Sequence, residues 1–291
     1  MSARPVIAGT DGSGGATRAV AWAAEEARLR GLPLQIACVL ARRTAGPPLV
    51  AEDIVRRAAA VARINGPGVP VGTRVLHGRP DEVLARLAAD AELLVVGHRG
   101  GGRALPTLGR TAARLVRAAR PAVAVVRAAP GRPVPDRARP VLVAVDGRPG
   151  SGALVRYAAD TAAARDADLH IAHIWDERPA DVAARLGRRQ RVPHRVAAER
   201  ALAEIAATVT ADHPGLRIRC TVERGRPAWS VLELSDAAQL VIVGRHLGPG
   251  LGALTSVLLQ ASSCPVLLAP RSPAGVARPR RREGTASTPA G

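Results

Sequence analysis

The chain has 291 residues, enough for two domains of ordinary size that each bury their own core. Apolar residues make up 47% of it, yet Phe is absent and aromatic residues are only 1%, so we expect cores of Ala, Val, Leu and Ile, as in parallel sheets covered by helices. The formal net charge is +18 and Lys is absent, which excludes a Walker A phosphate loop because that loop requires Lys.

The segment 1–127 alternates short apolar runs with helical patterns. Val6–Ala8 is an apolar run that ends in Gly-Thr-Asp-Gly-Ser, and apolar residues at helical spacing follow it as far as Gly31, an expected helix-ending glycine. Further strands are predicted over 34–40, 71–76, 93–96 and 122–126, and further helices over 51–64, from Gly78-Arg79-Pro80-Asp81 to about 89, and over 111–119. The βαβαβαβαβ order predicts a doubly wound α/β domain, a five-stranded parallel sheet with helices on both faces.

The same pattern then starts again. Asp146 repeats Asp11 at an offset of 135, and Gly244 repeats Gly97 at an offset of 147, so the second copy is longer by 147 − 135 = 12, near 178–194. We interpret the chain as a tandem duplication. The predicted segments are a first domain at 1–127, a Pro- and Arg-rich linker at 128–138, a second domain at 139–270, and an Arg-rich tail at 271–291 that is too polar to fold.

The stretch Leu93–Thr111 is the main candidate for a functional loop. An apolar strand runs into Gly97, a glycine cluster follows, and a helical segment begins just beyond. Backbone N–H groups and the helix dipole favour an anion at such a turn, although an ordinary strand-to-helix connection has a similar glycine content. If the first and fourth strands flank the point where the winding of the sheet reverses, Asp11 shares one crevice with this loop.

Two residues at the end of the first strand suggest how a nucleoside could be held. Gly9 would let a planar base approach the strand closely, and the carboxylate of Asp11 could accept hydrogen bonds from a base or a ribose. The alternative for Asp11 is that it only caps the helix that follows.

Other nucleotide, catalytic and metal-binding patterns are missing from the sequence. No G-x-G-x-x-G follows the first strand and no G-x-S-x-G occurs, which argues against a dinucleotide-dependent dehydrogenase and an α/β-hydrolase. His170 and His173 lie three apart on a strand and so point to opposite faces, which is wrong for a shared metal. His98 and His246, in the two glycine loops, could touch phosphate but are expected to be exposed loop residues. No positioned general base or nucleophile is evident, so we expect binding rather than transfer chemistry.

These residues resemble the universal stress protein family. The likeness lies in Asp-Gly-Ser after the first strand, Gly-Arg-Pro before the third helix and Val-Val-Gly-x-Arg-Gly at the glycine loop, and it covers residues 4–127 and 139–270. It implies strand order 3-2-1-4-5 in each domain and, as in many members, a site for ATP. In the first copy the positions implied for adenine are Asp11 and Val39, and those for ribose and phosphates are Gly97, Gly100, Gly101, Arg103, Gly109, Arg110 and Thr111.

Both copies depart from the family pattern G-x2-G-x9-G followed by Ser or Thr. In the first copy the loop is one residue short, and Arg110 stands where the hydroxyl is expected, with Thr111 beside it. In the second copy Leu247 replaces the second glycine, the loop is five residues shorter, and Ala253 has no hydroxyl. We therefore expect the first copy to bind nucleotide better. The corresponding positions of the second copy are Asp146, Ile174, Gly244 and Gly252.

The resemblance implies an adenine-nucleotide-binding regulator of stress response or dormancy. We expect ATP, with Mg²⁺ arriving on the nucleotide, and two domains packed as an intramolecular pseudo-dimer; a homodimer of whole chains is left open. One alternative is a scaffold that acts through protein partners, suggested by the altered loops. A less favoured one is nucleic-acid binding through the Arg-rich surface, whose charge a GC-rich coding bias also explains.

Cysteine spacing and hydropathy indicate a cytoplasmic protein. Cys38, Cys220 and Cys264 are odd in number and far apart, which fits a reducing compartment. The N-terminal apolar stretch is too short for a signal sequence, and no apolar run approaches the roughly 20 residues that a bilayer requires, so no membrane association is expected.

Overall fold

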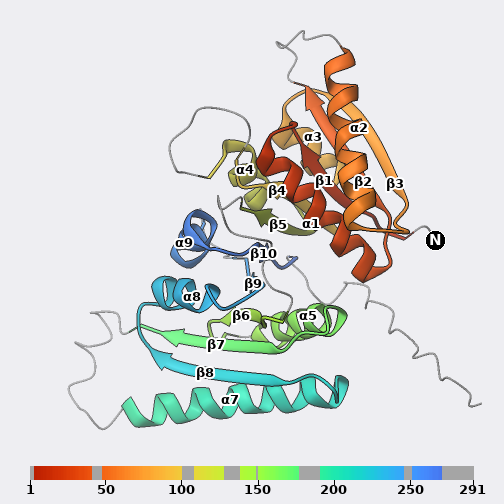
Figure 1. Ribbon diagram of the computed structural model, residues 1–291. Coiled ribbons are helices and arrows are strands. Elements are labelled where there is room, and N and C mark those ends of the chain that lie inside the picture. The colour runs from red at the N-terminus through yellow and green to blue at the C-terminus, as the bar shows by residue number, and fades with distance from the viewer. Residues whose placement is uncertain are drawn as a thin grey trace, which may run out of the picture.

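The computed structural model describes residues 3–40, 48–99, 108–127, 138–148, 150–176, 191–245 and 251–270. Their strands form one ten-stranded sheet with helices on both faces (Figure 1). The elements of the first half are β1 (Val6–Thr10), α1 (Gly14–Arg30), β2 (Leu34–Leu40), α2 (Pro48–Asn65), β3 (Val71–His77), α3 (Pro80–Leu87), β4 (Leu93–Gly97), α4 (Arg110–Ala118) and β5 (Ala122–Val126). Those of the second half are β6 (Val141–Val145), α5 (Ser151–Ala164), β7 (Leu169–Trp175), α7 (Arg191–Asp212), β8 (Ile218–Arg224), α8 (Pro227–Ser235), β9 (Leu240–Val243), α9 (Ala253–Ala261) and β10 (Val266–Leu268).

The strand order is β3-β2-β1-β4-β5-β10-β9-β6-β7-β8. The first five strands confirm the predicted 3-2-1-4-5 order, and the last five repeat it in reverse along the sheet. Neighbours within each half are parallel, but β5 and β10 pair antiparallel, with Leu267 opposite Ala124. Because the direction reverses at this pair, the carboxyl ends of the strands in the two halves point to opposite edges of the sheet.

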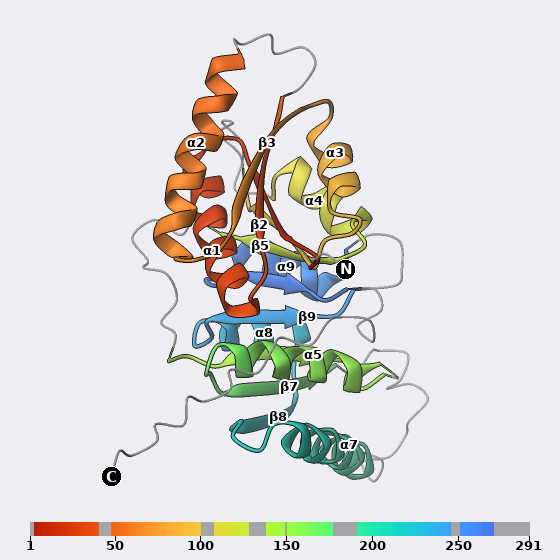
Figure 2. The ribbon, with the colours of Figure 1, turned by 90° about the vertical axis from the view of Figure 1, so that its right-hand side faces the viewer.

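The helices form two layers. Core residues of α1, α2, α5 and α7 pack on one face of the sheet, and those of α3, α4, α8 and α9 on the other. Figure 2 shows α1 and α2 on one side of the first half and α3 and α4 on the other. The start and end of α1 follow from its sequence: Ser13 Oγ accepts a hydrogen bond from the Ala16 N–H at 3.3 Å, and Gly31 ends the helix at φ 64°, as predicted.

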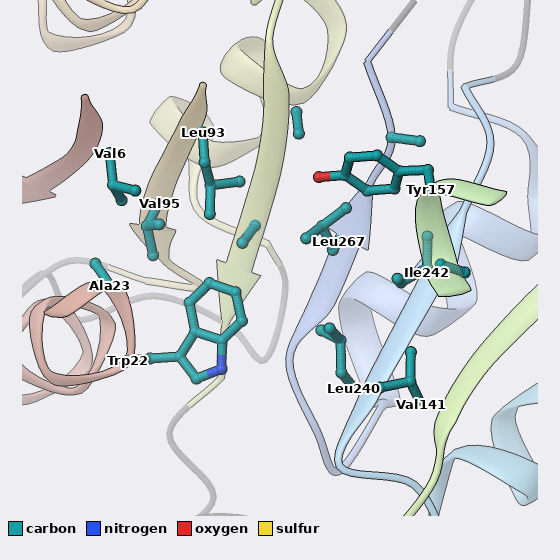
Figure 3. Close-up of a cluster of buried hydrophobic side chains, with 14 of the residues drawn as sticks. Val6, Trp22, Ala23, Leu93, Val95, Val141, Tyr157, Leu240, Ile242 and Leu267 are labelled. Carbon is teal, nitrogen blue, oxygen red and sulfur yellow. The ribbon is translucent and has the colours of Figure 1, made fainter. Parts of the chain in front are cut away.

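The core is aliphatic, as the composition predicts, with one large aromatic residue from each half. Trp22 of α1 and Tyr157 of α5 belong to the same cluster, together with residues of β1, β4, β6, β9 and β10 (Figure 3). Along β1, Val6 and Ala8 face this cluster and Ile7 faces the opposite one. The strand is buried on both sides, which explains its uninterrupted apolar sequence.

A cluster of buried charged residues lies against these two aromatic rings and joins the halves. The carboxylate of Glu26 accepts a hydrogen bond from Arg165 Nη2 at 2.6 Å and one from Arg30 Nη2 at 3.4 Å. The guanidinium of Arg30 lies 5.8 Å from the centre of the Tyr157 ring, and that of Arg165 lies 5.5 Å from the Trp22 ring. Cation–π contacts are strongest when desolvated, as these are, so the cluster ties α1 to α5.

Several predicted segments fall outside the described residues. These are residues 128–137 of the linker, most of the insertion near 178–194 and the tail at 271–291.

Helix α2 begins at Pro48, earlier than the expected start at Ala51, because Pro is well tolerated in the first turn of a helix. Among the described helices, none is both long and apolar enough to cross a bilayer.

Candidate functional site

The first candidate site lies where β1 and β4 end. These strands are neighbours, with Ala8 opposite Val95, and β2 flanks β1 on its other side, with Thr10 opposite Cys38. The chain leaves β1 toward α1 and leaves β4 toward α4, so the winding of the sheet reverses here, as predicted. We call this edge, with Asp11, Val39, Gly97 and the start of α4, the first switch point. Ligands of doubly wound sheets bind at such points.

Asp11 lies just before the N-terminus of α1. Its Oδ1 accepts hydrogen bonds from the Ser13 N–H at 3.0 Å and from Ser13 Oγ at 2.6 Å. Ser13 is the N-cap, so Asp11 supports the cap without being it. The side chain of Asp11 is exposed; burial, and then the negative charge of Asp11, raise the pKa of the Cys38 thiol at the end of β2. The carboxylate of Asp11 is therefore close enough to β2 for its charge to influence Cys38. Strand β2 is the side of the switch point on which the adenine is expected.

Gly97 has a packing role at the end of β4. A Cβ at this position would lie 3.0 Å from the carbonyl carbon of Gly15 and 3.1 Å from the N of Ala16, both backbone atoms of α1. Gly15 in turn lies against the carbonyl oxygen of Arg99, 2.9 Å from where its own Cβ would stand. The two glycines let the glycine loop start directly on the first turn of α1, which brings the N-terminus of that helix to the switch point.

Gly9 does not have the role expected from the sequence. A Cβ there would lie 2.9 Å from Leu84 Cδ1 of α3 and 3.4 Å from Val96 Cγ1. Leu84 belongs to the core between the sheet and α3. The space above Gly9 is filled by this side chain and is not open to a planar base. Sequence reasoning missed this because Leu84 is far from Gly9 in the chain and belongs to another element.

The N-terminus of α4, which is the positive end of the helix dipole, lies at the first switch point. Gly109 is the N-cap, offers no side-chain cap, and donates its N–H to the carbonyl of His98 at 2.9 Å. The first N–H groups of a helix have no acceptor within it, and here they belong to Arg110, Thr111 and the residue after them. No acidic residue lies in the first turn. An anion is therefore favoured at this end. Gly100, Gly101 and Arg103 lie outside the described residues.

His98 differs from the expected exposed loop residue. It is 4% exposed, and its imidazole lies beside the backbone of Leu259, in α9 of the other half. Burial, followed by the charges of Arg127 and Arg99, lowers its pKa from 6.5 to about 4, so the imidazole is neutral at pH 7. His98 thus belongs to the junction between the halves. His246 lies outside the described residues.

The second switch point, at the ends of β6 and β9, has looser contacts. Asp146 Oδ1 accepts from the Arg148 N–H at 3.1 Å, and Ser151 Oγ is 3.5 Å away. A Cβ on Gly244 would lie 3.5 Å from Leu154 Cδ2, an ordinary contact. Gly252 is the N-cap of α9, again without a side-chain cap, and Ala253 follows it. Ile174 occupies the position of Val39, near the end of β7.

The two strand histidines have separate partners. His170 Nε2 lies 2.8 Å from Thr221 Oγ1, and His173 Nδ1 lies 3.1 Å from the carbonyl of Val145. Within the described ranges, no three His, Cys, Asp or Glu side chains are placed to share a metal ion.

Known proteins share this architecture along almost the whole chain. The model of the universal stress protein family matches residues 2–127 and 137–270. The chain belongs to this family. A universal stress protein of Mycobacterium tuberculosis is 31% identical over 309 residues, covering 92% of this chain and 96% of its own. One from Mycolicibacterium smegmatis is 32% identical over 293 residues, covering 94% and 97%.

A solved universal stress protein shows the same fold at low identity. The crystal structure of the protein from Archaeoglobus fulgidus aligns with a TM-score of 0.67 at 16% identity and covers 92% of this chain and 98% of its own. The fold of this universal stress protein is thus shared with a solved structure over both halves.

Sequence reasoning about this universal stress protein missed one residue beside the second switch point. Arg245 directly follows Gly244, and its guanidinium donates to carbonyls of the first half at Val116 and Ala119. The repeat itself carried a signal, because Arg245 corresponds to His98 at the same offset that relates Gly244 to Gly97. Two unlike side chains at equivalent positions both reach across the junction.

Proposed function

We propose that the first switch point binds an adenine nucleotide, ATP with Mg²⁺, and that the chain regulates a stress response through that binding. The convergence of the Asp11 carboxylate, the end of β2 and the anion-favouring start of α4 at one sheet edge supports the proposal. A carboxylate accepts from sugar hydroxyls, an apolar residue such as Val39 packs on a base, and helix N–H groups hold phosphate.

Charge at this edge also favours phosphates. Arg110 is exposed at the first position of α4, and Arg99 lies at the start of the glycine loop. A guanidinium can bind two phosphate oxygens at once, which compensates for the hydroxyl that Arg110 replaces. Thr111, one residue later, supplies a hydroxyl of its own. The Mg²⁺ ion is proposed to be held mainly by the phosphates.

Binding rather than catalysis is the proposed activity. The Asp11 carboxylate is engaged with Ser13, and the imidazole of His98 is neutral and directed toward α9. Neither group is placed to activate a water molecule at the start of α4. We expect ATP hydrolysis to be slow. The cytoplasmic location expected from the cysteine pattern stays a prediction.

The second switch point is proposed to bind nucleotide more weakly. Gly244 is exposed and makes no close approach to α5. The first residue of α9 is Ala253, which has neither a hydroxyl nor a charge. Fewer donors and a looser helix contact both reduce the free energy available for holding phosphates.

Two measurements test the proposal. Mass spectrometry of small molecules released from denatured purified protein should detect ATP or ADP. Titration calorimetry should give at least a tenfold weaker ATP affinity for Asp11→Ala than for the wild type, about 1.4 kcal/mol or more. Asp146→Ala, the equivalent change at the second switch point, should leave the tighter site unchanged. No binding at millimolar nucleotide, or equal effects of the two variants, would overturn the assignment.

A scaffold that acts through a protein partner is the second candidate. Trp229, on α8, is 55% exposed, and aromatic residues are enriched in protein interfaces relative to the rest of the surface. This candidate gains if purified protein carries no nucleotide and Trp229→Ala abolishes capture of a partner that the wild type retains.

A further inference from the structure

Helices α4 and α9 each run from one switch point to the other. Helix α4 begins at Arg110, at the first switch point, and ends at Ala118. Because the halves are antiparallel across β5 and β10, the end of α4 reaches the sheet edge where β6 and β9 terminate. Helix α9 runs the opposite way, and Figure 1 shows both helices beside the junction of the halves. Each helix of nine residues spans about 13 Å.

The far end of α4 is held by a residue of the second glycine loop. Arg245 Nη1 donates to the carbonyls of Val116 at 3.0 Å and Ala119 at 2.8 Å, and Nη2 donates to the carbonyl of Pro121. Its Nε donates to the carbonyl of Ala269, after β10, at 3.0 Å. The last carbonyls of a helix lack partners within it and carry the negative end of the dipole, so a planar cation suits them.

The far end of α9 is held by residues of the first half. Arg127 Nη1 donates to the carbonyl of Gln260, and the imidazole of His98 lies beside the backbone of Leu259. The backbone of His98 also connects the end of β5 to the start of α4. Its N–H donates to the carbonyl of Val126 at 2.8 Å, and its carbonyl accepts from the Gly109 N–H at 2.9 Å. One residue therefore touches the start of α4 and the end of α9.

We propose that Arg245 is a positioning residue for the nucleotide site of the first half, and that α4 couples the two switch points. The inference rests on the proposed function. Arg245 sets where α4 lies along its axis, and hence where the N–H groups of Arg110 and Thr111 meet the phosphates. By linkage, a nucleotide that fixes the start of α4 also favours the position of Arg245 in which its guanidinium binds the end of α4.

The second half therefore contributes to the first site without supplying a group that touches the ligand. This gives the second switch point a role even where its own nucleotide affinity is weak. It also explains why Arg245 is anchored to three carbonyls of the other half while Gly244 beside it is exposed.

The test compares two arginines that both bind helix-end carbonyls. Arg245→Met removes the contact with α4, and Arg139→Met removes a similar one, since Arg139 Nη1 donates to the carbonyl of Asp236 after α8 at 2.7 Å. The full chain is used throughout, with ATP affinity from calorimetry and the thermal midpoint from calorimetric scans. We expect Arg245→Met to weaken ATP binding about fivefold or more, and Arg139→Met to leave it within about twofold.

Rescue separates positioning from stability. Arg245→Lys keeps the charge at the end of α4 but loses the planar fork, so it should recover part of the affinity. If Arg245→Met and Arg139→Met lower the thermal midpoint while both bind ATP like the wild type, Arg245 is only structural and the inference is overturned.

A measurement on the wild type keeps the inference testable if Arg245→Met does not fold. Saturating ATP should slow amide hydrogen exchange both in residues 112–118 of α4 and in residues 243–245 at the second switch point, and Asp11→Ala should show neither effect. Slowing confined to α4 would overturn the coupling while leaving the proposed function intact. Failure of the wild type to bind ATP would overturn the proposed function, and the inference with it.

Discussion

Arg30 and Arg165 occupy equivalent positions in the two halves, at the same offset that relates Asp11 to Asp146, and each guanidinium lies over an aromatic ring of the other half. Their surroundings are not equivalent. Glu26 binds both arginines, whereas Thr161, its counterpart, donates only to the carbonyl of Tyr157 at 2.9 Å. Likewise Glu92 is 3.7 Å from Arg30, while its counterpart Gln239 receives the hydrogen bond of Arg165.

This difference makes the interface specific for the pairing of two unlike halves. The pair of halves brings two arginines and two carboxyl groups together, Glu26 and Glu92. Two first halves paired in the same way would bury four such carboxyl groups with two arginines, and two second halves would bury two arginines with none. Unbalanced buried charge is costly, so the observed pairing within one chain is the favoured one.

The same comparison holds at the switch points. Gly97 is packed against backbone of α1, while Gly244 is exposed. His98 and Arg245 both cross the junction, but the imidazole of His98 is neutral at pH 7, whereas the guanidinium of Arg245 stays charged. The halves have thus kept the fold and the contact surface while diverging in packing and in charge. Substitutions at these positions test the differences between the halves one at a time.

The largest effect is expected from Glu26→Gln. Both arginines stay buried while the carboxylate that they share is removed, so the free energy of unfolding should fall by about 3–5 kcal/mol. Thr161→Val, at the equivalent position, loses one hydrogen bond and should cost about 1 kcal/mol. Urea unfolding followed by far-UV circular dichroism measures both. Equal losses for the two variants would show that the cluster is not centred on Glu26.

A pH effect of up to about 3 kcal/mol is expected from His98. Its pKa in the folded protein, about 4, lies below the ordinary 6.5 because of burial and of Arg127 and Arg99. The unfolded chain therefore binds more protons between these values. The contribution of His98 is complete above about pH 6.5 and is lost as the pH falls toward 4.

His98→Gln isolates this contribution, because Gln keeps a hydrogen-bond donor and does not titrate. Urea unfolding at pH 7 and at pH 4.5 should show a smaller loss of stability for the variant than for the wild type. Arg245→Gln should not alter the pH dependence, since Arg stays charged across this range. Parallel pH profiles for the wild type and His98→Gln would contradict the burial of the imidazole.

Gly97→Ala should destabilise the protein by about 1–3 kcal/mol, because the new methyl group meets backbone atoms of Gly15 and Ala16 that cannot turn aside. Gly244→Ala meets only the end of a leucine side chain at ordinary distance and should change stability by less than about 0.5 kcal/mol. Thermal unfolding of both variants checks the contrast. A tolerated Gly97→Ala would mean that β4 and α1 are further apart than described.

The smallest effect is expected at the contact between α3 and α4. Arg114 Nη1 donates to Asp81 Oδ2 at 2.9 Å, and the equivalent positions of the second half hold Ala228 and Val257. The pair is partly exposed, so Asp81→Asn should cost no more than about 1 kcal/mol, and less at high salt. Chemical unfolding at low and at high salt tests this. A larger, salt-independent loss would indicate that Asp81 has a role beyond the ion pair.

Local pattern was enough to predict most of the fold. Strands buried on both faces, such as Val141–Val145, are continuous apolar runs, and α1 is bounded by Ser13 and Gly31, whose chemistry starts and stops helices. The repeat at fixed offsets disclosed the duplication, and the reversal of winding predicted that Asp11 and Gly97 share an edge. These properties depend on neighbours in the chain or on the handedness of crossovers, both of which a sequence displays.

Only the tertiary structure decided how the halves meet and what the site residues touch. The pairing of β5 with β10 and the burial of His98 against α9 join residues far apart in the chain. So do the filling of the space above Gly9 by Leu84 and the reach of Arg245 to the end of α4. No periodicity encodes such contacts, because they depend on which surfaces are complementary once both halves of the sheet have formed. A glycine or a histidine in a loop therefore shows its role only when the opposing helix is in place.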